Sequence, residues 1–286
     1  AMAATLQVYG DITQRTAALA IAPLLKRGDA DMVLEKLGQT FVLPTKSTIV
    51  AKFRRYEALP LATTALVEGV TPTGTKPTVT DYTATLVEHG DFIPYSGFML
   101  DTHEDPILKE YGALCVQQAT ETVETLRYNV VKAGTAVGYA NGSARTDVNT
   151  VITLEKQRVA TNAILRQRGR MINEMVSSDA RFRTEPVEAS FFAVVHVDVE
   201  NDIRNMTGFI PTARYGAQSK FSNEIGSVEN VRYLRSILFT PFADGGGAKG
   251  VMRSTTGTSA DVYPVLYFAK DAFGIVPLKG SNAMAL

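Results

Sequence analysis

The longest regular pattern in the sequence is an apolar stripe at helical spacing between residues 105 and 133. Apolar or small residues recur there in steps of three and four, at Leu108, Tyr111, Cys115, Ala119, Val123, Leu126, Val130 and Ala133. Gly134 follows as a stop signal. The pattern predicts one helix of about 42 Å. A single narrow stripe on so long a helix is typical of packing against a sheet, and it makes Cys115 an inert core thiol.

The residues before this helix, Asp101 to Asp105, bring three carboxylates and a histidine together. One interpretation is a metal-dependent hydrolase that uses His103, Glu104 and Asp105. The favoured interpretation is a helix start, with Asp105 as N-cap and Pro106 at the first helical position. Consecutive residues ahead of a helix point in different directions, whereas metal ligands need a shared face.

Residues 44–98 are expected to form a long two-stranded excursion. The stretch TIVAKFRRYE alternates, with Ile49, Ala51 and Phe53 on one face. TVTDYTATLVEHGDF is the second strand, and Glu68 to Thr78 form a turn-rich tip between them. A lone ribbon is marginal in water. It should therefore lie on another surface, and the basic and aromatic KFRRY segment is interpreted as interface rather than nucleic-acid contact.

Residues 1–43 are expected to form an arm. DITQRTAALAIAPLLKRG places Ala17, Ala20, Ile21, Leu24 and Leu25 on one helical face, which Pro23 kinks or restarts. A second short helix is predicted from Ala30 to Leu37. Two such helices bury too little apolar area to fold alone, so they must dock elsewhere.

The rest of the chain places helices and strands in blocks, which predicts an α+β fold. A locally basic helix is expected over 153–170, with Val159, Ala160, Ala163 and Ile164 on its apolar side. Its basic residues are solvated, or they contact phosphate or an acidic neighbour. Strands are expected at 191–199, 231–239 and 262–278, with a short helix N-capped by Asp198 after the first and a flexible loop over 240–261.

Composition excludes several classes of protein. Lys plus Arg and Asp plus Glu are both 29, so the net charge of zero argues against a free-standing nucleic-acid binder. One cysteine excludes an intrachain disulfide, and neither a leader nor a membrane span is expected. Phosphate-loop and nucleophile-elbow motifs are missing, and His196 is interpreted as a structural residue although it could pair with Asp198 as a ligand. We expect no enzyme activity and no cofactor.

Nine short stretches, in one order, resemble the major capsid proteins of tailed bacteriophages, specifically the N-four-type family with the Hong Kong 97-like fold. They are LEKLGQT (34–40), KFRRYEALP (52–60), EGVTP (68–72), DTHEDP (101–106), ETLRY (124–128), KAGT (132–135), YANG (139–142), VVHVDVENDIRNM (194–206) and EIGSVENVRY (224–233). Members of that family continue beyond FGIVPLKG with tryptophan-containing chain, whereas this sequence has no Trp.

The resemblance implies a domain plan. It consists of an N-terminal arm (1–43), an extended loop (44–98), a peripheral domain (99–185) with a spine helix (103–134), an axial domain (186–261) and a return strand (262–286). The ribbon residues expected to contact other subunits are Lys52, Arg54, Arg55, Tyr56, Glu57 and Glu68.

The implied function is structural: hexamers and pentamers of the chain close into an icosahedral shell around double-stranded DNA, which is held without sequence-specific binding. Portal, scaffold and decoration proteins are the implied partners, with assembly in the host bacterial cytoplasm and no membrane. An encapsulin-like compartment of the same fold is the alternative.

Overall fold

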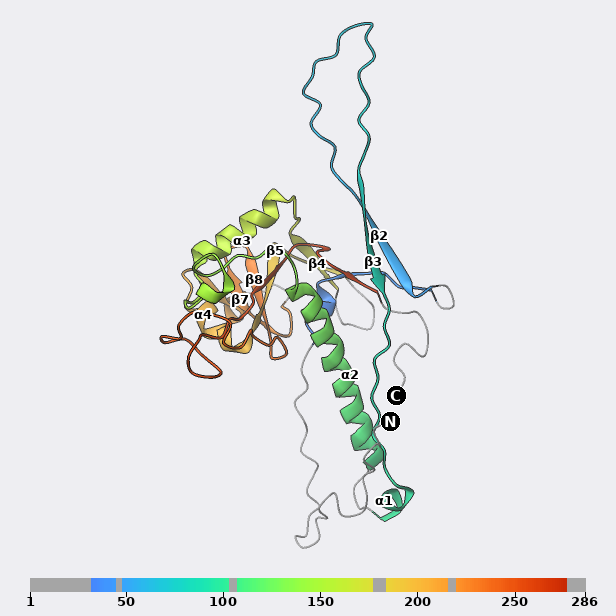
Figure 1. Ribbon diagram of the computed structural model, residues 1–286, viewed down its shortest axis with the longest axis vertical. Coiled ribbons are helices and arrows are strands. Elements are labelled where there is room, and N and C mark those ends of the chain that lie inside the picture. The colour runs from blue at the N-terminus through green and yellow to red at the C-terminus, as the bar shows by residue number, and fades with distance from the viewer. Residues whose placement is uncertain (1–31, 45–47, 103–106, 177–183, 216–219, 277–286) are drawn as a thin grey trace. The chain divides into compact units, whose positions relative to one another are not determined.

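The computed structural model describes residues 32–44, 48–102, 107–176, 184–215 and 220–276 (Figure 1). The chain divides into two compact units. The first comprises residues 1–39 and 91–274, and the second comprises 40–90 and 275–285. The arm helix predicted from residues 11–28 and the helix start at Asp105 and Pro106 lie outside the described residues.

A six-stranded sheet forms the centre of the first unit, with the order β4-β5-β8-β7-β6 and β9 paired to β5. Its strands are β4 (Ile172–Val176), β5 (Thr184–His196), β6 (Phe209–Pro211), β7 (Glu224–Val228), β8 (Val231–Ser236) and β9 (Leu266–Phe268). β5 and β8 run parallel, and the other pairs are antiparallel. The blocks of strands and helices confirm the α+β prediction.

β5 is buried on both faces, which explains its uninterrupted apolar run. Phe192 and Val194 belong to one core cluster, while Phe191, Ala193 and Val195 belong to another on the opposite side of the strand. All five side chains are fully buried. A strand covered on both faces reads as continuously hydrophobic rather than alternating.

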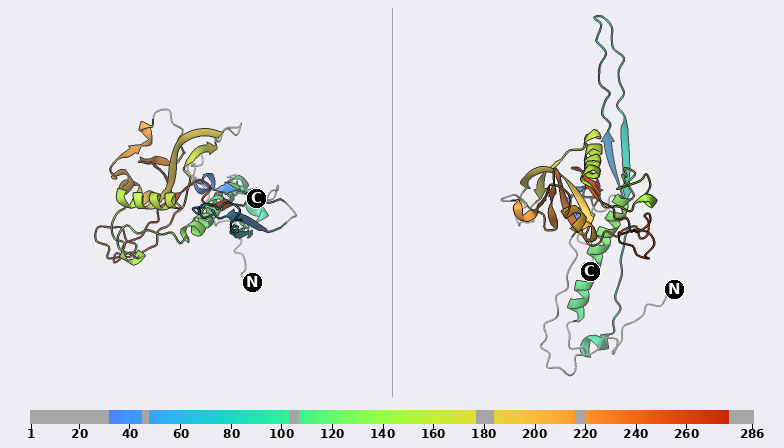
Figure 2. Two further views of the ribbon diagram at one scale, coloured as in Figure 1. Left: turned by 90° about the horizontal axis from the view of Figure 1, so that it is seen from above. Right: turned by 90° about the vertical axis from the view of Figure 1, so that its left-hand side faces the viewer.

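Different elements close the two faces of the sheet. Tyr128 of α2 (Ile107–Lys132) joins the cluster around Phe192, together with Val33, Leu34 and Leu37. The turn η3 (Val197–Val199) and α4 (Glu200–Arg204) contribute to the cluster around Phe191, and α3 (Leu154–Arg166) packs against it. Figure 2 gives two further views of the sheet and of the helices around it.

The prediction of a long helix is confirmed by α2, which has 26 residues, but the predicted buried stripe is wrong toward both ends, and Leu108 near its start is 57% exposed. Val130 is 76% exposed and Leu126 is 37% exposed. The buried positions are Glu124 and Tyr128, one helical turn apart. Glu124 is not part of the predicted apolar stripe, but its carboxylate accepts hydrogen bonds from the backbone of Val33 and Leu34 and is therefore retained inside.

The apolar side predicted for α3 is wrong in part, because Val159 is 59% exposed, whereas Ile164 of the same predicted side does pack against the core. The buried face contains Gln157 and Thr161, with Leu154 and Ile164 packed against the core. Gln157 donates to the carbonyl of Val228 and accepts from the hydroxyl of Tyr233, so its burial leaves no polar atom unpaired. On the exposed side Arg158 pairs with Glu229 of the same chain.

The second unit contains the ribbon of β2 (Val50–Tyr56) and β3 (Val79–Thr85). The strands are antiparallel, and Ala51 lies opposite Ala84 and Phe53 opposite Tyr82. This register confirms the predicted pairing and the predicted faces. Residues 57–78 between the strands carry no helix or strand, in agreement with the predicted tip.

Shorter elements replace three of the predictions. Residues 34–36 form a single 3-10 turn, η1 (Leu34–Lys36), followed by β1 (Gln39–Thr40), instead of a helix from residue 30 to 37. The predicted strand over 262–278 is reduced to β9 and β10 (Gly274–Ile275). β10 pairs with β1, and the boundary between the units passes through both.

The segment from residue 240 to 261 contains no named strand, yet it is closely packed. A Cβ on Gly246 would lie 2.2 Å from the carbonyl oxygen of Val148, so only glycine fits there. Bridges join Phe242 to Val262 and Ala248 to Ser259. The predicted loop is therefore tied down by its backbone hydrogen bonds.

Candidate functional site

The charged face of the ribbon is organised around Asp81, which lies directly opposite Arg54. Arg54 donates from Nε to Oδ1 at 2.8 Å and from Nη2 to Oδ2 at 3.0 Å. Lys52 Nζ lies 2.8 Å from Oδ2. These hydrogen bonds, Arg54's first, hold the pKa of Asp81 below its ordinary range, and the same pairing raises the pKa of Arg54.

Sequence reasoning chose Lys52 and Arg54 but missed Asp81. The available signal was alternation, since Asp81 precedes Tyr82 and so had to lie on the face opposite to it. A strand pairing register is needed to bring Asp81 to Arg54, and the sequence alone does not specify one.

The remaining chosen residues are spread over the ribbon and its tip. Arg55 Nη2 contacts Glu57 Oε2 at 3.1 Å, and Thr80 donates to Glu57 Oε1 at 3.1 Å. Tyr56 is 69% exposed at the end of β2. Glu68 lies in the tip and is exposed. The ribbon thus holds the six residues on one element without gathering them into a pocket.

Large apolar side chains accompany these charges along the second unit, and they are open to solvent in the single chain. The exposed ones between residues 49 and 87 are Ile49, Val50, Tyr56, Leu59, Leu61, Leu66, Val67, Val70, Val79, Tyr82 and Val87. Leu61 is 84% exposed. An exposed apolar run of this extent is typical of an interaction surface.

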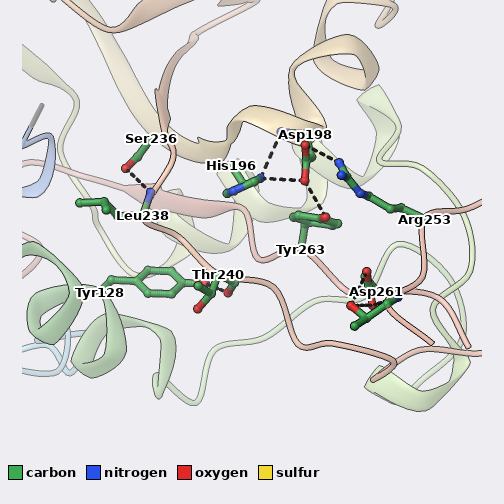
Figure 3. A network of polar contacts seen from close by, with 10 residues as sticks. Tyr128, His196, Asp198, Ser236, Leu238, Thr240, Arg253, Asp261 and Tyr263 are labelled. Carbon is green, nitrogen blue, oxygen red and sulfur yellow. Dashed lines mark hydrogen bonds and ion pairs between the residues drawn. The ribbon is translucent and has the colours of Figure 1, made fainter. Parts of the chain in front are cut away.

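A second cluster of polar groups lies where β5 ends (Figure 3). Asp198 Oδ2 accepts from the hydroxyl of Tyr263 at 2.8 Å, and Oδ1 lies 2.5 Å from Arg253 Nη1. The backbone N–H of Asp198 donates to Nδ1 of His196 at 3.1 Å. The prediction of Asp198 as a helix N-cap is wrong, because its carboxylate turns toward these side chains and Val199 occupies the cap position of α4.

The charge states of Asp198 and Tyr263 fit a structural role rather than catalysis. Partial burial of Asp198 raises its pKa, but the hydrogen bond from Tyr263 and the charges of His196 and Arg253 outweigh it, so the pKa lies below normal. Burial and the bond to Asp198 raise the pKa of Tyr263 to about 12. Near neutral pH Asp198 therefore stays ionised and Tyr263 stays protonated, and together they attach the segment at 253–263 to the end of β5.

The hypothesis of a metal-dependent hydrolase gains no support from the described part of the chain. Within it, no group of three or more His, Cys, Asp or Glu side chains is arranged to hold a metal ion. His103, Glu104 and Asp105 lie outside the described residues. Among the helices that are described, none is both long and apolar enough to cross a bilayer.

The structure was compared with known proteins. The fold is similar to a chain in the capsid structure of the cyanophage P-SCSP1u, with a TM-score of 0.52, 14% identity, and coverage of 95% of this chain and 85% of that chain. A chain of the mature capsid of bacteriophage PhiM1 gives a TM-score of 0.44 and 14% identity over 87% of this chain and 78% of that chain, a likeness that carries no weight for the fold.

The sequence was also compared with known proteins and protein families. No curated protein sequence matches this one significantly. The sequence model of a family described as phage capsid protein matches residues 80–277, which is more than half of the 286 residues. The match includes β3, α2 and the whole six-stranded sheet. The chain therefore belongs to the phage capsid protein family.

Proposed function

We propose that the chain is the major capsid protein of a tailed phage and that many copies of it close into an icosahedral shell around double-stranded DNA. Its membership of the phage capsid protein family supports a structural role in the virion. The observation that carries the mode of assembly is the ribbon, whose apolar side chains find no cover in the described part of its own chain.

The physical argument concerns the stability of the ribbon. Two strands alone are marginal in water, because they bury little apolar surface and leave two edges unpaired. Among the described residues of the second unit, the buried hydrophobic ones are Leu43, Ala51 and Ile275. A neighbouring subunit would cover the exposed apolar residues, and repeated contacts of this kind sum to a stable closed assembly.

The finer assignment is the Hong Kong 97-like fold in its N-four-type form. Under it, residues 1–43 are the arm, 44–98 the extended loop, 99–185 the peripheral domain, 186–261 the axial domain and 262–286 the return strand. The long α2 and the separate ribbon unit support this division. The contacts between subunits would use Lys52, Arg54, Arg55, Tyr56, Glu57 and Glu68.

The expected partners follow from this assignment. The chain would form hexamers and pentamers in the bacterial cytoplasm, with portal, scaffold and decoration proteins. A net charge of zero fits a shell that encloses dense DNA without binding it tightly.

The first test is sedimentation of the purified full chain, followed by negative-stain imaging of fast-moving species. Closed megadalton particles are the expected result, with the chain co-expressed with its phage's scaffold and portal where it does not assemble alone. A chain that stays monomeric with those partners present would contradict the proposal. The content of the particles then distinguishes the two alternatives, because a phage capsid holds nucleic acid and an encapsulin-like compartment holds protein.

A further inference from the structure

The described first unit has an open groove along one side of α2. Its volume is about 510 Å³, and it is lined by Leu114, Gln117, Gln118, Glu121, Thr122, Thr125, Leu126 and Leu238. Leu114 and Leu126 mark the two ends of its helical wall and are each more than a third exposed. The groove thus offers apolar surface that the described residues leave uncovered.

The polar side chains of the groove already have partners. Gln117 donates to Glu121 at 2.8 Å, and Gln118 donates to Asp91 at 2.9 Å. Thr122 and Thr125 donate to carbonyls one turn earlier in the helix. An apolar ridge can therefore cover the groove without leaving these groups unsatisfied, and this removes the usual penalty for burying polar atoms.

Val33 and Leu34 contact α2 beside this groove. Oε1 of Glu124 accepts the backbone N–H groups of Val33 and Leu34 at 2.8 and 2.9 Å. Val33 and Leu34 are buried, and Arg127 Nη1 lies 3.5 Å from Glu35. Glu124 is only three residues from Glu121 and one from Thr125, both of which line the groove. Residues 33–35 are therefore anchored to α2 next to the groove.

We propose that residues 17–25 of the same chain dock in this groove. This goes beyond the proposed function, because it concerns the folded subunit and not the shell. Ala17, Ala20, Ile21, Leu24 and Leu25 repeat at i, i+3, i+4, i+7 and i+8, the pattern by which one helix packs along another, with the kink or restart predicted at Pro23 near the end of this face. Its two alanines permit a close approach to the threonines of α2.

The connecting chain is long enough for this docking. The eight steps from Leu25 to Val33 span up to about 26 Å when extended. Leu114 lies about 15 Å from Glu124 along the helix axis, at 1.5 Å per residue. A segment tethered to Glu124 can thus reach both ends of the groove. Such a short tether raises its effective concentration there above that of a segment from another copy.

Disulfide trapping in the full-length chain tests the proposal. The native thiol is removed with Cys115→Ser, and Leu24→Cys is combined in turn with Gln118→Cys, Thr122→Cys and Thr125→Cys. The matched control pairs Leu24→Cys with Val116→Cys, because Val116 is exposed on the opposite side of α2. We expect at least one groove pair to form an intrachain bond rapidly, whereas the control does not.

Three results would overturn the proposal: no groove pair cross-links, the bonds join only different chains, or the control cross-links equally fast. An independent measurement uses chymotrypsin, which cleaves after Leu24 and Leu25. Leu114→Glu combined with Leu126→Glu should speed that cleavage roughly tenfold by emptying the groove. Unchanged cleavage in this variant, folded by circular dichroism, would also overturn it. Both experiments read out on unassembled subunits, so failure to form shells does not affect them.

Discussion

At the scale of single residues, two carboxylates show how similar groups serve different purposes. Glu124 is fully buried and binds the backbone of a segment far away in the sequence. Asp81 lies on the ribbon surface and is held by two cations. Burial makes the first a structural requirement, while solvent screening leaves the second free to serve contacts with other molecules.

Replacing Glu124 with alanine should lower the free energy of unfolding by about 2–4 kcal/mol, because two buried N–H groups lose their acceptor. Urea denaturation of unassembled subunits measures the change. Glu121→Ala, one turn earlier, is the matched control and should cost less than about 0.5 kcal/mol, since its carboxylate bonds only to a side chain. Equal losses in both variants would contradict the role assigned to Glu124.

The titration of Asp81 tests the geometry of the ribbon. Its folded pKa is depressed, so the stabilisation from ionised Asp81 is present above the normal pKa of 3.8 and is lost as the pH falls below that value. Arg54→Ala should bring the pKa back toward 3.8, and Lys52→Ala should have a smaller effect because Arg54 is the larger cause. Carboxyl NMR of unassembled subunits measures both. The reverse order would contradict the bidentate pairing with Arg54.

At the scale of elements, the ribbon and α2 both expose apolar residues that a single chain does not cover. For α2 we propose that the arm of the same chain covers the exposed apolar residues. For the ribbon we propose that another subunit covers them, because the ribbon belongs to a separate unit with little buried surface of its own. We therefore expect assembly to depend on the ribbon more than on α2.

Charge reversal on the ribbon should block assembly and leave the subunit folded. We expect Arg54→Glu or Arg55→Glu to abolish fast-sedimenting particles with an unchanged circular dichroism spectrum, because both side chains are exposed and no core depends on them. The double variant Arg54→Asp with Asp81→Arg distinguishes a contact of Arg54 with a neighbouring subunit from a role that is confined to its pairing with Asp81.

That exchange restores the pairing within the ribbon but not the charge offered to a neighbour. We expect it to remain defective in assembly. Normal shells from the exchanged pair would mean that Arg54 serves only Asp81, and normal shells from Arg55→Glu would remove Arg55 from the set of contact residues.

At the scale of the whole molecule, the chain combines a unit that has a core with one that has almost none. The six-stranded sheet and its two clusters of buried residues give the first unit its own stability. The second unit offers length and exposed surface instead. Under the proposed function, neighbouring subunits of the shell would cover the surface that the second unit exposes.

Local patterns in the sequence were sufficient for the existence of α2, α3, β2, β3, β5 and β8, because period 3.6 and period 2 depend only on neighbouring residues. The opposing faces of the ribbon followed from the same alternation. The nine short motifs and their order indicated the resemblance to phage capsid proteins. None of these predictions required knowing which distant residues meet.

Only the tertiary structure decided what depends on distant contacts. The parallel pairing of β5 with β8 and the pairing of Arg54 with Asp81 are matters of register between separate segments. Glu124 and Gln157 are buried because they form hydrogen bonds with backbone groups far away in the sequence, which a polarity pattern does not reveal. Hydrophobic periodicity reports which residues avoid water, whereas a buried polar group is explained only by its partner.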